Sequence, residues 1–211
     1  MKPLALELLS IPLVLGCAAP ASQAQTEPLP RNPAQGAPIR FGDPQELAYS
    51  APFFADAIHD PQFTTPDAVL GQTHGSRLAH HAEILACFRA WAAESPRIRV
   101  ETFARTHEGR ELVWAAISSP KNLQRLDAIR ADLARLADPR GLSEAEAERI
   151  LAGPAVAWMG YSIHGDELSG ADAAIALGYH LVADTGRETA KLLDELVIVI
   201  DPCLNPDGRE R

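Results

Sequence analysis

An imidazole and a carboxylate three residues apart, His164 and Glu167, are the side chains of this sequence best suited to chemistry. They follow an apolar run, residues 155–163, which is typical of a strand buried on both faces. Ser169, with Asp172 three residues later, favours the start of a helix directly after the pair. Open α/β sheets bind ligands at the carboxyl ends of their strands, and nitrogen and oxygen donors suit Zn²⁺. The pair is therefore a candidate zinc site.

The alternative for the pair is a surface histidine next to a glutamate that the helix dipole favours in a first turn. A second segment decides between these interpretations. The apolar run at residues 196–200 also predicts a buried strand, and an Asn-Pro-Asp-Gly turn follows it at residues 205–208. Two such strands joined by a helix form a βαβ unit with parallel strands. Parallel strands end at the same edge of a sheet, so we expect the turn to lie beside His164 and Glu167.

Together, the His-Gly-Asp-Glu-x-x-Gly segment at 164–170 and the Asn-Pro-Asp-Gly-Arg-Glu-Arg segment at 205–211 resemble the zinc carboxypeptidase (carboxypeptidase A-type) family. The resemblance includes the order of the elements from about Arg97 onwards. It implies an α/β fold with a mixed, mostly parallel sheet, helices on both faces and an opening antiparallel hairpin. It also implies that the chain carries the N-terminal part of the catalytic domain, so that the domain is incomplete at Arg211.

The resemblance assigns His164 and Glu167 as two ligands of one Zn²⁺ ion. A catalytic zinc has three protein ligands and one water, so the resemblance places a third ligand, a histidine, beyond Arg211. The glutamate that serves as general base and the groups that bind the substrate are also expected beyond Arg211. The implied activity is hydrolysis of C-terminal peptide bonds in peptides or proteins by a zinc-activated water. We expect this chain alone to be inactive.

Two other functions stay open at this stage. One is a related zinc amidohydrolase that removes acyl groups from amino acids, although such enzymes lack the Asn-Pro-Asp-Gly turn. The other is a non-catalytic binding module that keeps the fold. A net charge of −9 argues against nucleic acid and anionic membrane surfaces as partners.

The N-terminal residues predict export. Lys2 and the short apolar stretch 8–16 are typical of a signal peptide over residues 1–24, and the stretch is too short to span a bilayer. Cys17 follows a sequence that resembles a lipobox, which would anchor the protein to a membrane by a lipid. A cleavage site at Ser22-Gln23-Ala24 would instead release it, so we expect a periplasmic or anchored lipoprotein, or a secreted protein. Residues 25–66, rich in proline, predict an irregular tether before the catalytic part at 67–211.

The remaining elements follow from periodicity and turn residues. Helices are predicted at 78–93, 122–137, 143–151 and 168–182, and a hairpin of strands 98–103 and 112–118 encloses a turn at 107–110. Cys87 and Cys203 lie in apolar surroundings and are predicted to be free, buried thiols. Asn205 and Asp207 are expected to stabilise their own turn, with Gly208 at positive φ.

Overall fold

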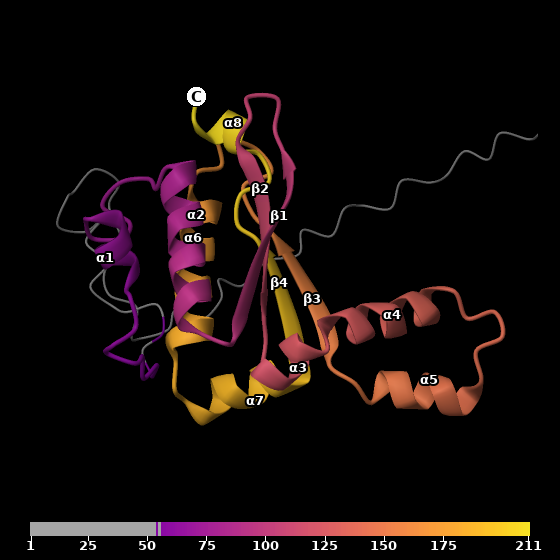
Figure 1. The fold of residues 1–211 in the computed structure, drawn as a ribbon. Helices are drawn as coiled ribbons and strands as arrows, with labels where there is room; N and C mark the ends of the chain where they lie inside the picture. The colour runs from indigo at the N-terminus through magenta and orange to yellow at the C-terminus, as the bar shows by residue number, and fades with distance from the viewer. Residues whose placement is uncertain (1–53, 55) are drawn as a thin grey trace, which may run out of the picture. The chain divides into compact units, whose positions relative to one another are not determined.

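A computed structural model of the protein describes residue 54 and residues 56–211 (Figure 1). The strands are β1 (Ile98–Arg105), β2 (Glu111–Ile117), β3 (Ala155–Gly160) and β4 (Leu196–Asp201). The helices are α1 (Pro66–Leu70), α2 (His81–Glu94), α3 (Pro120–Gln124), α4 (Leu126–Ala137), α5 (Glu144–Leu151), α6 (Ser169–Ala183), α7 (Arg187–Glu195) and α8 (Pro206–Arg209). None of these helices has the length and apolar character needed to cross a membrane. The predicted signal, Cys17 and most of the tether lie outside the described residues, so these stay predictions.

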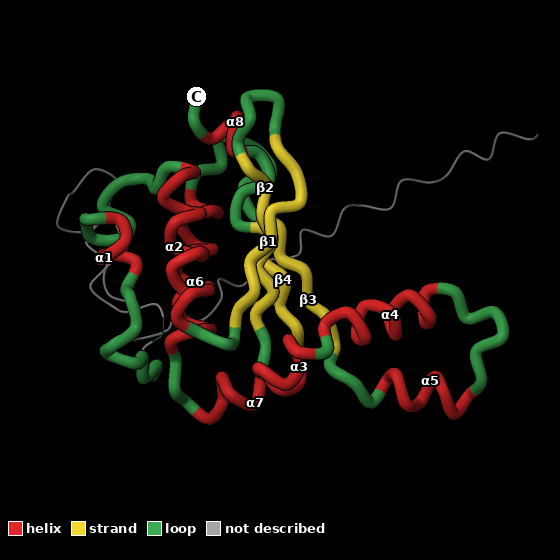
Figure 2. Tube along the Cα trace, in the orientation of Figure 1, coloured by secondary structure: helices red, strands yellow, loops and turns green. Residues whose placement is uncertain are grey.

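The four strands form one mixed sheet in the order β1-β2-β4-β3 (Figure 2). The predicted hairpin is confirmed: β1 and β2 pair antiparallel, and Gly109 in their turn has a φ of 81°. The predicted parallel pair is also confirmed, because Ala155 of β3 lies opposite Leu196 of β4. β2 and β4 are antiparallel. The mixed α/β sheet is as expected, but the expected parallel majority is not found among the described strands, because the hairpin makes two of the three pairings antiparallel.

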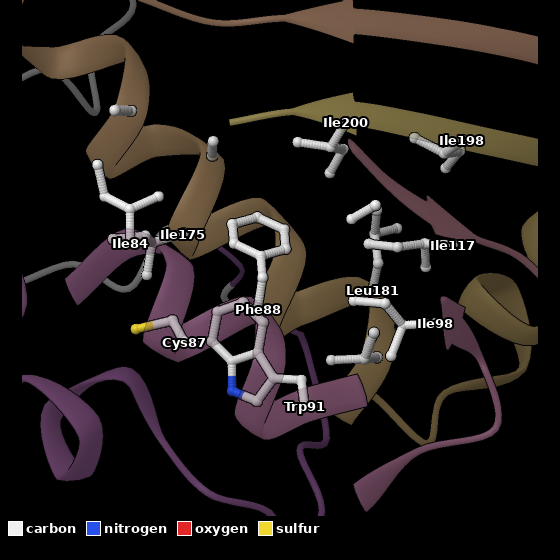
Figure 3. Close-up of a cluster of buried hydrophobic side chains, with 14 of the residues drawn as sticks. Ile84, Cys87, Phe88, Trp91, Ile98, Ile117, Ile175, Leu181, Ile198 and Ile200 are labelled. Carbon is white, nitrogen blue, oxygen red and sulfur yellow. The ribbon is translucent and has the colours of Figure 1, made fainter. Parts of the chain in front are cut away.

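The main core lies between one face of the sheet and the helices α2 and α6 (Figure 1). Phe88 and Trp91 of α2 are fully buried and pack with Ile198 and Ile200, which alternate along β4 (Figure 3). α6 approaches α2 closely at Gly178, where an added Cβ would lie 3.0 Å from the Phe88 ring. The spacing of apolar residues on residues 78–93 had predicted this helix and its buried face.

Cys87 and Cys203 are free and buried, as predicted. Burial raises the pKa of the Cys87 thiol to about 12 and also raises the pKa of Cys203. Both thiols therefore remain protonated at neutral pH and act as small apolar side chains.

The opposite face of the sheet is covered only in part. Ile129 of α4 packs with Ala116 of β2 and Val197 of β4. Beyond it lies an open apolar groove of about 450 Å³, to which Val156 and Trp158 of β3 contribute. These two residues are 38% and 67% exposed. The prediction that this strand is buried on both faces is wrong for the described chain, since every residue of β3 except the half-buried Ala157 is exposed.

The Asp184 carboxylate accepts hydrogen bonds from three residues where α6 ends. Its Oδ1 atom accepts hydrogen bonds from the backbone N–H groups of Ile58 (2.9 Å) and Gly186 (3.2 Å), and its Oδ2 accepts one from the Thr189 hydroxyl (2.5 Å). Burial disfavours the charged carboxylate, but these hydrogen bonds outweigh burial, so the pKa of Asp184 lies below its usual value.

We expect Asp184→Ala to lower the free energy of unfolding by about 1–3 kcal/mol, because three donors lose their acceptor. Because the pKa is lower in the folded than in the unfolded state, the ionised carboxylate stabilises the fold above the unfolded value of about 3.9. This stabilisation is lost as the pH falls through the folded pKa. Urea unfolding between pH 2 and 7, on protein expressed from its complete gene, measures both effects. Asp194→Ala, at an exposed carboxylate of α7, is the control, and equal stability of the two variants would contradict the role of Asp184.

Candidate metal centre

The candidate ligands lie in the loop between β3 and α6, residues 161–168, which we call the β3–α6 loop. His164 Nδ1 lies 3.1 Å from Glu167 Oε1, and the two side chains are 69% and 64% exposed. A turn in the backbone brings them together, in which the Glu167 N–H donates to the His164 carbonyl at 3.3 Å. The spacing of three residues thus places both donors on one side of the loop.

The loop is fixed to the segment that follows β4. The Tyr161 N–H donates to the Asp201 carbonyl and the Leu204 N–H to the Tyr161 carbonyl, both at 2.9 Å. The Asn205 N–H donates to the carbonyl of Ser162 at 3.0 Å. These bonds continue the parallel pairing past the ends of the strands. They confirm that the turn at 205–208 lies beside the His164 loop.

Two glycines allow the loop and the turn to touch. A Cβ atom on Gly165 would lie 2.2 Å from the carbonyl carbon of Gly208, so a side chain at 165 would collide with backbone. Gly208 does not have positive φ, which corrects the prediction, because it belongs to the short helix α8. A Cβ there would meet the Asn205 side chain at 2.7 Å. The predicted stabilisation of the turn by Asn205 is confirmed, since its Oδ1 accepts from the Gly208 N–H at 3.0 Å.

Asp207 has a different role from the one expected. Its carboxylate accepts hydrogen bonds from the hairpin between β1 and β2, namely from Thr106 Oγ1 (2.8 Å), Arg110 Nη1 (2.7 Å) and the Glu108 N–H (3.3 Å). Figure 1 shows α8 beside the tip of this hairpin. Asp207 therefore connects the turn to the hairpin and not to itself.

The start of α6 also differs from the expectation. Leu168 is its N-cap, without a side-chain bond, and Ser169 is already the first helical residue. Asp172 instead binds Arg209, with 2.6 Å between Oδ2 and Nη2, and accepts from the Ala79 N–H at 3.1 Å. Sequence reasoning missed Arg209, and no local signal distinguishes it from its exposed neighbour Arg211.

The geometry of the pair fits two ligands of one zinc ion. An imidazole nitrogen and a carboxylate oxygen are donors that zinc takes in proteins, and the two lie 3.1 Å apart on one side of the loop. Within residues 54 and 56–211, His, Cys, Asp and Glu side chains form no group of three that could hold a metal ion. The assignment of His164 and Glu167 as zinc ligands therefore stays a prediction, and no third ligand accompanies them in the described chain.

Sequence comparison defines the class of protein. The family model for zinc carboxypeptidases matches residues 84–211, which include both segments of the candidate centre. The chain belongs to the zinc carboxypeptidase family. A comparison with curated proteins gave no match.

Among solved structures, the carboxypeptidase A of Helicoverpa armigera is similar at 20% identity with a TM-score of 0.46, covering 69% of this chain and 31% of that one. A metallo-carboxypeptidase of Burkholderia cenocepacia is similar at 20% identity with a TM-score of 0.41, covering 59% and 26%. The chain thus spans between about a quarter and a third of the length of these structures. The family assignment rests on the sequence match.

Proposed function

We propose that the protein is a zinc-dependent carboxypeptidase, which hydrolyses the C-terminal peptide bond of peptides or proteins. The observation that carries the proposal is the convergence of His164 Nδ1 and Glu167 Oε1 to 3.1 Å in the segment that matches the family. The family supports a metallopeptidase, and the choice of the C-terminal bond as the target is the finer part of the proposal.

In this proposal, His164 and Glu167 would bind the zinc ion and fix its position at the end of β3. His164 would bind through Nδ1, which requires the neutral ring with its proton on Nε2. Glu167 would bind as a carboxylate, next to it on the same loop. The chemistry that zinc supplies in such a site is activation of a water and polarisation of the scissile carbonyl. Both side chains are exposed at the edge of the sheet, so a substrate can approach them. A third ligand and a general base from residues after Arg211 are part of the proposal.

Peptide hydrolysis by protein expressed from its complete gene tests this function. One set of peptides has a free C-terminal carboxylate, a matched set has a C-terminal amide, and N-acyl amino acids form the third set. We expect residues to be released one at a time from the free C-terminus only. A strong chelator should stop the release, and added Zn²⁺ should restore it.

Each other outcome contradicts the proposal in a defined way. Cleavage of N-acyl amino acids alone would favour the amidohydrolase. Cleavage inside the amidated peptides would indicate an endopeptidase. A protein that binds zinc and peptide without cleaving any substrate would be a binding module. Release that persists after complete removal of metal would exclude the zinc mechanism.

A further inference from the structure

The side chain of Arg209 is almost completely buried, with 2% of it exposed, and all three of its nitrogen atoms are bonded. Nε donates to the Ala79 carbonyl at 3.0 Å, and Nη1 donates to the Leu168 carbonyl at 2.6 Å. Nη2 donates to Asp172 Oδ2 at 2.6 Å. The planar guanidinium can reach three acceptors in fixed directions, which a lysine ammonium on a flexible stem cannot reproduce.

These partners surround the end of the β3–α6 loop. Leu168 directly follows Glu167, and Asp172 lies one turn into α6. Ala79 lies two residues before α2 begins and also donates its N–H to Asp172. Arg209 therefore joins the residue after the candidate ligand to α6 and to the segment that leads into α2.

The loop receives support from α8 and its flanking residues at two points. Gly165, directly after His164, lies against the backbone of Gly208. Leu168, directly after Glu167, is bonded to Arg209. Within the described residues, the side chains of His164 and Glu167 make their polar contact with each other and with no other side chain. Their positions therefore depend on the backbone that carries them.

We propose that Arg209 is a positioning residue for the zinc pair, and this inference rests on the proposed function. By binding the Leu168 carbonyl, its guanidinium sets the direction in which the Glu167 side chain leaves the loop. Residues that orient metal ligands contribute about 10–100-fold to metal affinity. The buried charge is balanced by Asp172, so the two residues act as one unit.

The test compares two arginines at opposite ends of the same helix. Arg97 Nη1 donates to the Asp184 carbonyl at 2.6 Å, at the C-terminal end of α6 and away from the loop. Arg209→Met and Arg97→Met are each made in protein expressed from its complete gene. Arg97→Met removes the bond to Asp184, and Arg209→Met removes the bonds to Ala79, Leu168 and Asp172. Zinc affinity is measured by competition with a chelator, below the melting temperature of every variant. The absorption spectrum of the Co²⁺-substituted protein reports the geometry of the ligands.

We expect Arg209→Met to weaken zinc binding by about 10–100-fold and to alter the Co²⁺ spectrum. Arg97→Met should lower the melting temperature and leave both metal readouts unchanged. Arg209→Lys should recover part of the affinity, since it keeps the charge beside Asp172. Equal zinc affinity of the two methionine variants would overturn the proposal.

If Arg209→Met does not fold, the lysine variants of the two arginines decide. Weaker zinc binding by Arg209→Lys than by Arg97→Lys supports the positioning role, and equal binding overturns it. A wild-type protein that binds no zinc, or a His164→Ala variant that binds zinc as tightly as the wild type, would instead overturn the proposed function. The two failures are therefore distinguishable.

Discussion

His164→Ala is expected to remove zinc and peptidase activity together from the protein expressed from its complete gene. A catalytic zinc site of this kind has three protein ligands, and two remaining ligands bind the ion poorly. Activity should fall at least about a thousandfold, because removal of even one group that stabilises the developing charge costs about 10²–10³-fold. The measurements are zinc content by atomic absorption and the rate of release of the C-terminal residue.

The control is His107→Ala, at an exposed histidine in the β1–β2 turn. It should retain zinc and activity, because no described contact joins its side chain to the β3–α6 loop. A His164→Ala variant with wild-type zinc content would show that this residue is not a ligand. Loss of zinc with full activity would show that the metal is not catalytic.

The second large effect concerns the 211-residue chain expressed alone, which we expect to aggregate or to lack a cooperative unfolding transition. Val156 and Trp158 on β3 are exposed beside an apolar groove, and in the described chain β3 pairs on one side only. An exposed apolar edge strand without charge or proline promotes pairing with other chains. Apolar surface left in water loses about 25 cal/mol per Å², against a net domain stability of only about 5–15 kcal/mol.

Solubility and thermal unfolding of this chain test the expectation. Trp158→Lys should increase the soluble fraction, because a lysine on an edge strand opposes pairing between chains. Leu151→Lys is the matched control, since it replaces an exposed leucine (71% exposed) of α5, outside the edge strand. A wild-type chain that is monomeric and unfolds in one sharp transition would contradict the expectation.

Local patterns were sufficient to predict the four strands, the longer helices α2, α4 and α6, the short helix α5 and the neighbourhood of the candidate site, but not the helices α1, α7 and α8. The hairpin follows from two β-rich runs around Gly109, and the proximity of the His164 loop to the 205–208 turn follows from parallel pairing. The approach of His164 to Glu167 was predicted from their three-residue spacing within one turn. These features involve neighbours in sequence or a general rule of topology, so one sequence suffices.

The features that were missed depend on distant partners. The apolar run of β3 predicts burial, but the distant segments that pack on its faces decide it, and β3 is exposed in the described chain. Asp172 was predicted to cap its own helix, and it binds Arg209, 37 residues away. Asp207 was predicted to stabilise its own turn and binds the hairpin tip instead. Charged side chains can satisfy their bonds locally or at long range with similar energies, so spacing alone does not decide between these options.

The contact between Gly165 and Gly208 joins two segments that are synthesised at different times. The ribosome delivers the β3–α6 loop first, and β4 and α8 leave the exit tunnel later. Until Gly208 and Arg209 arrive, the backbone that carries His164 and Glu167 lacks its two supports. The loop can therefore take the arrangement seen in the structure only after both supporting residues have been made.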